Sequence, residues 1–346
     1  MHLSKRIHVP LTSQITKPCY FAEKELIQHN ISLRDKNWFR TGGPARFFAE
    51  PTSHEEFQTT LAWARAEKLP VFVLGCGANI LISDSGFSGL VIRPQLNTIE
   101  CLQHQSCSSD TENTTQHALL KAGAGVTIAQ LISYSLEHNL LGLEEFSGIP
   151  ATVGGAVFIN LHYYEFVLSN FIVSAEIIEK ETGAIKTVDA DWLQLGYDQS
   201  KLFDGTHYIV SATFKLRRCT DLEAACAQGR RTEIIRHRVK RYPSTNTCGS
   251  FFRNFHDHEV TMMSNGKKMI HTAYYLDKLG IKGTLQVGDA MVSWQHANML
   301  VNKGNATSAD IINLARIMQQ LVFNSFGIMP QSECQLIGFN EYPLLR

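Results

Sequence analysis

The chain has 346 residues, of which 44% are hydrophobic and 18% are charged, as expected for a soluble globular protein of two or three domains. Lysine plus arginine and aspartate plus glutamate each number 32, so no net charge attracts the chain to nucleic acid or to an anionic membrane. The eight cysteines include no C-x-x-C pair, which disfavours a disulfide framework and a structural zinc site, and we expect no bound metal.

The N-terminal third predicts a first α/β unit. Residues 1–30 are a polar extension without an apolar segment, and no run of about 18 apolar residues follows anywhere, so we expect a cytoplasmic protein. The turn at Gly42–Pro44 predicts a strand on either side of it. Ser53 and Glu56 form a capping box for a helix that leads into the strand VFVLG. This β-α-β order predicts a subdomain over residues 31–97.

A glycine-rich loop interrupts the hydrophobic run after VFVL. Residues without bulk at Cβ let backbone amides approach an anion directly, so the loop predicts a pyrophosphate site. It differs from the usual dinucleotide fingerprint, because no G-x-G-x-x-G opens a helix here, and a glycine-rich turn between strands is more often only a turn. The residues of the loop are Gly75, Cys76, Gly77, Ala78, Asn79 and Ile80.

A second unit is expected over residues 98–218. The composition turns polar over residues 98–117, where residues 103–116 predict an exposed loop. Thr127 then caps a helix with one apolar face. A second glycine-rich stretch, Glu145–Asn160, would let the backbone pack closely against a flat polar group. Two such stretches can hold one extended cofactor between two subdomains. The strands VSAEIIEK and HYIVSATFKL complete the unit.

Residues 219–346 predict a third, C-terminal domain. Thr220 and Glu223 form the capping box of a helix whose second half is rich in arginine and lysine. We interpret these basic residues as a solvent-exposed face, because positive charge is favoured near the C-terminus of a helix. A further helix and short strands lead to a last helix, which begins at Thr307 and ends at Gly327.

Motifs along nearly the whole chain resemble the UDP-N-acetylenolpyruvoylglucosamine reductase family, flavoenzymes that complete UDP-N-acetylmuramate for peptidoglycan. The resemblance implies an α+β protein with an FAD-binding PCMH-like fold of two α/β subdomains and a C-terminal α+β substrate-binding domain. No long insertion separates Tyr197 from His207, as in the shorter, type II form of the enzyme. The matching motifs are Phe39–Ala45, Gly75–Leu81, Gly148–Ala156, Gly249–Asn254, His296–Asn302, and Glu333 before Ile337 and Gly338.

The resemblance implies non-covalent FAD as cofactor, NADPH as reductant and a small sugar nucleotide as substrate. It implies no nucleic acid, no membrane and no obligate protein partner. In the implied reaction, hydride passes from flavin N5 to C3 of the enolpyruvyl group and a proton is added at C2. The first glycine-rich loop would hold the flavin pyrophosphate together with Gly148, Ile149, Thr152, Val153, Gly154 and Gly155 of the second stretch.

The resemblance assigns three positions to catalysis. Ser250 would protonate C2, although without the family pattern it reads as a turn residue. Glu333 would hydrogen-bond the developing enol, which requires a cleft poor in water to keep its carboxyl group protonated. The family's arginine, which helps to neutralise the intermediate, is replaced by Asp198, for which Lys201 or a different loop register would have to compensate. Substrate contacts are implied for Tyr164, Arg253 and Asn254.

A second departure lies upstream of Asp198. The family motif M-N-A-G-A-Y-G here reads I-N-L-H-Y-Y-E, from Ile159 to Glu165, so that bulky side chains replace small ones. These substitutions leave another hypothesis open: a flavoprotein of the same fold that acts on a different small substrate, or that binds its cofactor without turnover.

Overall fold

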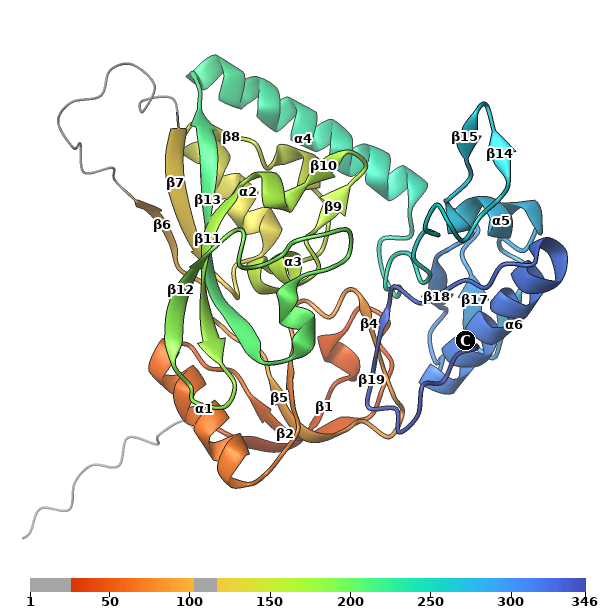
Figure 1. The fold of residues 1–346 in the computed structure, drawn as a ribbon, viewed down its shortest axis with the longest axis horizontal. Coiled ribbons are helices and arrows are strands. Elements are labelled where there is room, and N and C mark those ends of the chain that lie inside the picture. The colour runs from red at the N-terminus through yellow and green to blue at the C-terminus, as the bar shows by residue number, and fades with distance from the viewer. Residues whose placement is uncertain (1–25, 103–116) are drawn as a thin grey trace, which may run out of the picture.

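The computed structural model describes residues 26–102 and 117–346 (Figure 1). Residues 1–25 of the predicted extension and residues 103–116 of the predicted polar loop lie outside these ranges. Within the described ranges, no helix combines the length and the apolar character that crossing a membrane requires.

The first unit is a sheet covered by one helix. In chain order it contains β1 (Gln28–Ser32), β2 (Pro44–Ala49), α1 (His54–Ala66), β3 (Val71–Val73), β4 (Ile80–Ile82) and β5 (Phe87–Ile92). The strand order is β1-β2-β5-β3, with β1 antiparallel to β2 and with β5 parallel to both β2 and β3. As predicted, Ser53 caps α1 by accepting a hydrogen bond from the Glu56 amide. The helix then buries Phe57 and Leu61 in the core of this unit.

The segment before the turn at Gly42–Pro44 is a compact loop, and the strand predicted there is wrong. The side-chain amide of Asn37 donates hydrogen bonds to the carbonyl groups of Leu33, at 2.7 Å, and Thr41, at 2.8 Å. Such side-chain bonds to the backbone compete with strand pairing. The earlier strand β1 therefore pairs with β2 instead.

The second unit is an antiparallel sheet with helices packed against it. It contains β6 (Ile99–Leu102), β7 (His117–Gly123), α2 (Ile128–Glu137), β8 (Leu140–Leu141), α3 (Val153–Phe158), β9 (His162–Tyr163), β10 (Phe166–Val167), β11 (Ile172–Glu179), β12 (Ile185–Asp189) and β13 (His207–Arg218). The strand order is β12-β11-β13-β7-β6, and β8 also pairs with β13. Strand β6 precedes the predicted polar loop, and within it Ile99 and Cys101 face the core while alternate residues face outward.

The C-terminal unit is smaller and is joined to the others through two of its own elements. It contains α4 (Asp221–Arg241), β14 (Met263–Ser264), β15 (Lys267–Lys268), α5 (Thr272–Lys278), β16 (Gln286–Val287), β17 (Ala290–Val292), β18 (Leu300–Asn302), α6 (Ser308–Phe326) and β19 (Gln335–Ile337). Helix α4 lies along the second unit, where Ala227 joins the core, and Figure 1 shows it leading toward the blue domain. Strand β19 returns to the first unit and pairs in parallel with β4.

Helix starts follow the capping signals in the sequence. Thr127, Thr220 and Thr307 each complete a capping box at the start of α2, α4 and α6, and Gly327 ends α6 in the left-handed conformation. Helix α3 was not predicted, because its glycines have low helix propensity. Its N-terminus is nevertheless capped by Thr152, whose hydroxyl accepts a hydrogen bond from the Gly155 amide. The second glycine-rich stretch therefore opens a short helix. Short 3₁₀ turns complete the fold at Arg34–Lys36, Glu144–Phe146, Leu168–Asn170 and Lys201–Asp204.

Candidate active site

A cavity of about 970 Å³ lies where the three units meet. This volume is at the upper end of the range for ligand sites in proteins. The first unit lines it with the loop 75–80, the second unit with most of residues 148–155, and the C-terminal unit with Ser250 and Glu333. The two glycine-rich stretches and the two proposed catalytic residues of the C-terminal unit therefore face one space.

The two glycine-rich stretches touch each other at one wall of the cavity. A Cβ atom on Gly75 would lie 2.6 Å from the Thr152 hydroxyl oxygen, and one on Gly154 would lie 3.1 Å from the Ala124 side chain. Gly77 has a φ of +66°, and its Cβ would lie 2.6 Å from the Lys36 carbonyl oxygen. A larger residue at position 75 would push the two stretches apart, and one at position 77 or 154 would push its stretch away from the neighbouring segment.

The glycine-lined wall fits a bound FAD molecule. Backbone amides without flanking side chains suit a pyrophosphate group. The side-chain oxygen of Asn79 is buried beside the cavity and has no hydrogen-bond partner among the described residues. Buried acceptors are rarely left unpaired, so a donor group of a ligand fits this position. The residues present are consistent with the cofactor.

Replacing Gly75 with valine is expected to remove most of the bound flavin. Overpacking typically costs about 1–3 kcal/mol, which corresponds to roughly a 5- to 150-fold loss of affinity. Flavin absorbance near about 450 nm per mole of purified chain measures the effect. The control is Gly229→Val, because nothing lies within 4 Å of a Cβ on Gly229 in α4. Equal flavin content in Gly75→Val and wild type would contradict a role for this wall in cofactor binding.

Backbone pairing brings Ser250 and Glu333 onto adjacent segments. The Glu333 amide donates a hydrogen bond to the Phe251 carbonyl at 2.9 Å, and Phe252 pairs with Ser332. On its other side, Ser250 pairs with Met299. The serine and the glutamate are therefore fixed relative to each other by main-chain hydrogen bonds, independently of side-chain rotamers.

The surroundings of Glu333 favour its protonated form. Removal from water raises the pKa of this carboxyl group well above its usual value, and the negative charge of Asp198 raises it further. Burial also raises the pKa of Asp198, whereas the positive charges of His162 and Arg253 oppose that rise. Ionisation of Asp198 therefore makes ionisation of Glu333 less favourable.

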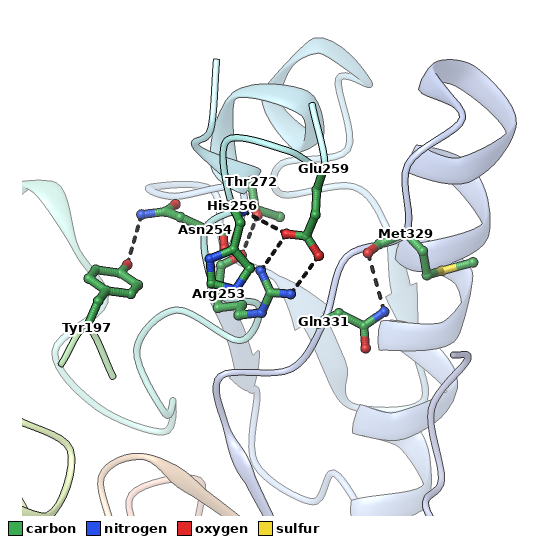
Figure 2. A network of polar contacts seen from close by, with 8 residues as sticks. All are labelled: Tyr197, Arg253, Asn254, His256, Glu259, Thr272, Met329 and Gln331. Atoms are coloured by element: carbon green, nitrogen blue, oxygen red, sulfur yellow. Dashed lines mark hydrogen bonds and ion pairs between the residues drawn. The ribbon is translucent and has the colours of Figure 1, made fainter. Parts of the chain in front are cut away.

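A hydrogen bond crosses from the second unit to the C-terminal unit at this cavity. Figure 2 shows the Asn254 side-chain amide donating to the Tyr197 hydroxyl oxygen, at 3.1 Å. The neighbouring Arg253 turns the other way and binds Glu259 through two hydrogen bonds of 2.8 Å each. Arg253 also donates a hydrogen bond to the Asn254 carbonyl oxygen at 2.8 Å. It thereby stabilises the backbone position of Asn254, which lines the cavity.

Three of the predicted site residues lie away from the cavity wall. Val153 is fully buried in the core of the second unit, because α3 turns this side chain toward the sheet. The Tyr164 side chain is 59% exposed, while its neighbour Tyr163 lines the cavity. Arg253 is engaged by Glu259, as described above. The remaining predicted residues of the two glycine-rich stretches line the cavity, as do Asp198, Ser250, Asn254 and Glu333.

The sequence interpretation missed Arg238 and His162. Arg238 belongs to the basic half of α4, which was interpreted as a solvated face, yet it lines the cavity. Its guanidinium group lies over the rings of Tyr163, at 4.9 Å, and Tyr242, at 5.3 Å, and its Nε atom has no hydrogen-bond partner among the described residues. Arg238 lies on the same helical face as Ala224 and Ala227, which are buried. This spacing is a weak signal in the sequence that this face of α4 is covered.

Known proteins resemble the chain over most of its length. It is 32% identical to UDP-N-acetylenolpyruvoylglucosamine reductase from Synechococcus sp. (strain JA-3-3Ab) over 321 residues, which cover 92% of this chain and 94% of the relative. Identity to the reductase of the same name from Gloeobacter violaceus (strain ATCC 29082 / PCC 7421) is 32%, covering 91% and 97%. The crystal structure of UDP-N-acetylenolpyruvylglucosamine reductase from Thermus caldophilus superposes with a TM-score of 0.66 at 27% identity, covering 89% of this chain and 97% of the other.

The fold and the glycine-lined cavity define an FAD-dependent oxidoreductase, and residues 45–189 match the family model of an FAD binding domain. Residues 240–337 match the C-terminal domain of UDP-N-acetylenolpyruvoylglucosamine reductase. The chain belongs to the UDP-N-acetylenolpyruvoylglucosamine reductase family. The predicted α+β, FAD-binding fold and the predicted enzyme class are confirmed.

Proposed function

We propose that this enzyme reduces UDP-N-acetyl-enolpyruvoylglucosamine to UDP-N-acetylmuramate for peptidoglycan synthesis in the cytoplasm, with NADPH as the reductant. The observation that carries the proposal is the pairing of the Ser250 and Glu333 segments beside a cavity that the two glycine-rich stretches also line. Bound FAD would supply hydride to C3 of the enolpyruvyl group and would be reduced again by NADPH.

Ser250 is the proposed proton donor to C2. Its hydroxyl group is a weak acid, but the carbon atom that it serves is strongly basic, so its position matters more than its pKa. The fixed backbone pairing of Ser250 with Met299 supplies that position. After donation, Ser250 takes a proton back from solvent before the next turnover.

Glu333 is the proposed hydrogen-bond donor to the carboxylate of the substrate. Negative charge moves onto that carboxylate as the enol-like intermediate develops, and a protonated carboxyl group stabilises it without adding a repelling charge. The raised pKa of Glu333 supports this role. We also propose non-covalent cofactor binding, since burial raises the pKa of the nearby Cys76 thiol and so disfavours its reactive thiolate form.

Substrate binding is proposed for Arg238 and Asn254. Arg238 offers a guanidinium group that suits the diphosphate of a sugar nucleotide, and its buried Nε atom has no hydrogen-bond partner among the described residues. Asn254 is held at the cavity by Arg253 and Tyr197. We assign residues 31–97 and 98–218 to the two FAD-binding subdomains and residues 219–346 to the substrate-binding domain. Helix α4, which begins the substrate-binding domain, packs on the second FAD-binding subdomain.

Anaerobic flavin spectroscopy tests the proposed reaction. NADPH is expected to bleach the yellow holoenzyme, and the enolpyruvyl nucleotide is expected to restore the colour in a single turnover, with UDP-N-acetylmuramate as product. Bleaching without recovery would refute the substrate assignment. Recovery with oxygen alone would favour the second candidate, a flavoprotein acting on a different acceptor, which the replacement of the family's arginine by Asp198 keeps open.

A further inference from the structure

The two departures from the family pattern at His162 and Asp198 meet in the cavity. The His162 Nδ1 atom lies 3.4 Å from an Asp198 carboxylate oxygen, although the residues come from separate segments of the second unit. Both side chains line the cavity. The His162 ring also packs against the Tyr197 ring, with 4.5 Å between their centres. An imidazole held between an acid and an aromatic ring has a defined orientation.

Two partly buried hydrogen bonds join the two segments and fix this arrangement. The Asn160 side chain donates to the Gly196 carbonyl at 2.9 Å, and the Ser200 hydroxyl donates to the Phe158 carbonyl at 2.5 Å. Gly196 and Gln199 pair across the turn that presents Asp198, which adopts a φ of +49°. That left-handed conformation is uncommon outside glycine, asparagine and aspartate, so the turn is built for a particular side-chain direction.

The two nitrogen atoms of His162 have different surroundings. Nδ1 is sealed from solvent beside Asp198 and makes no hydrogen bond to another described residue. The side chain as a whole keeps 25% exposure within a cavity-lining position, which leaves Nε2 as the nitrogen available to a ligand. With the Asp198 carboxylate beside Nδ1, the opposite edge of the imidazole ring, which carries Nε2, is the one that can meet a ligand.

We propose that His162, oriented by Asp198, binds the carboxylate of the substrate's enolpyruvyl group. This inference rests on the proposed function and names the residue that recognises the acidic end of the substrate. Asp198 would otherwise place a negative charge beside that carboxylate, and His162 converts the position into a donor. The other histidine of this wall, His296, is a poorer candidate, because burial and nearby positive charges lower its pKa to about 4 and keep it neutral.

Binding of two stable nucleotides to the oxidised holoenzyme tests this inference without turnover. UDP-N-acetylmuramate carries the carboxylate, whereas UDP-N-acetylglucosamine has the same nucleotide and sugar without it. A hydrogen bond to a charged group such as a carboxylate is worth about 1.5–3 kcal/mol, so His162→Gln should weaken UDP-N-acetylmuramate binding by roughly 10- to 150-fold. Its affinity for UDP-N-acetylglucosamine should change by less than about twofold. Calorimetry measures both, and His237→Gln on the exposed face of α4 is the matched control.

Variants of Asp198 show whether this carboxylate orients the His162 imidazole or only repels the negatively charged ligand. If the aspartate orients the imidazole, Asp198→Asn should weaken UDP-N-acetylmuramate binding and should have no further effect in the His162→Gln background. If Asp198 only repels the ligand, Asp198→Asn would tighten binding, and the inference would be overturned. The double variant His162→Gly with Asp198→Arg restores the family pattern and should recover the preference for the carboxylate.

The outcomes distinguish this inference from the proposed function. If the wild type binds both nucleotides, but His162→Gln weakens them equally or weakens neither, the role of His162 is refuted and the proposed function stands. If the wild type binds neither nucleotide, the proposed substrate and the inference fail together.

Discussion

Replacing Ser250 with alanine is expected to lower the rate of enolpyruvyl reduction by about 10²–10⁴, the usual contribution of a positioned proton donor. The change removes only the hydroxyl oxygen, and the backbone pairing of residue 250 with Met299 remains available to alanine. Cofactor binding and bleaching by NADPH should therefore be unchanged. Stopped-flow absorbance of the flavin follows the two half-reactions separately.

A matched control for this variant is Ser264→Ala, in the β14–β15 hairpin, which should leave both half-reactions unchanged. If Ser250→Ala slows bleaching by NADPH as much as it slows recovery, the serine acts on the cofactor site and the proposed proton transfer is wrong. A wild-type rate of recovery would show that another group delivers the proton.

Replacing Glu333 with glutamine is expected to lower turnover by about 10²–10³, as for the loss of one donor to a developing anion. Glutamine keeps the size of the side chain but offers a weaker donor than a carboxylic acid. Because the wild type needs protonated Glu333, its turnover should fall as pH rises through the raised pKa of this residue. The pH profile of the variant should lack that fall.

The same substitution should increase stability, and this readout is independent of catalysis. The pKa of Glu333 is raised in the folded state, so between its unfolded and folded pKa values the folded chain binds more protons. Its contribution is fully present below the unfolded value and is lost as pH rises through the folded value. The advantage of Glu333→Gln in thermal midpoint should therefore grow from about pH 4.5 upward. A constant difference across pH would show that Glu333 is not perturbed.

The sequence predicted those parts of the fold that depend on neighbouring residues. The caps at Thr127, Thr220 and Thr307 act within a single helical turn, and the structure confirms each of them. The order of the motifs also predicted the FAD-binding fold. The strand predicted before the Gly42–Pro44 turn is absent from the described residues 26–102, because the Asn37 side chain satisfies backbone groups that a strand would have used.

Contacts between distant segments could not be predicted in this way. The pairing of β19 with β4, the cavity-facing position of Arg238 and the contact of His162 with Asp198 all depend on how the units pack. The ion pair of Arg253 with Glu259 is closer in sequence, and the six-residue spacing was available as a signal. Charged residues near a motif should be checked for local partners before they are assigned to a ligand.

The parallel pairing of β19 with β4 has a consequence for biosynthesis. The Gln335 amide donates to the Asn79 carbonyl at 3.1 Å, so the edge beside the cofactor loop is completed by a segment that is translated long after the loop itself. A nascent chain on the ribosome has the loop but lacks its partner strand. We therefore expect translation products that stop before β19 to leave FAD unbound, so that cofactor loading waits for synthesis of this strand.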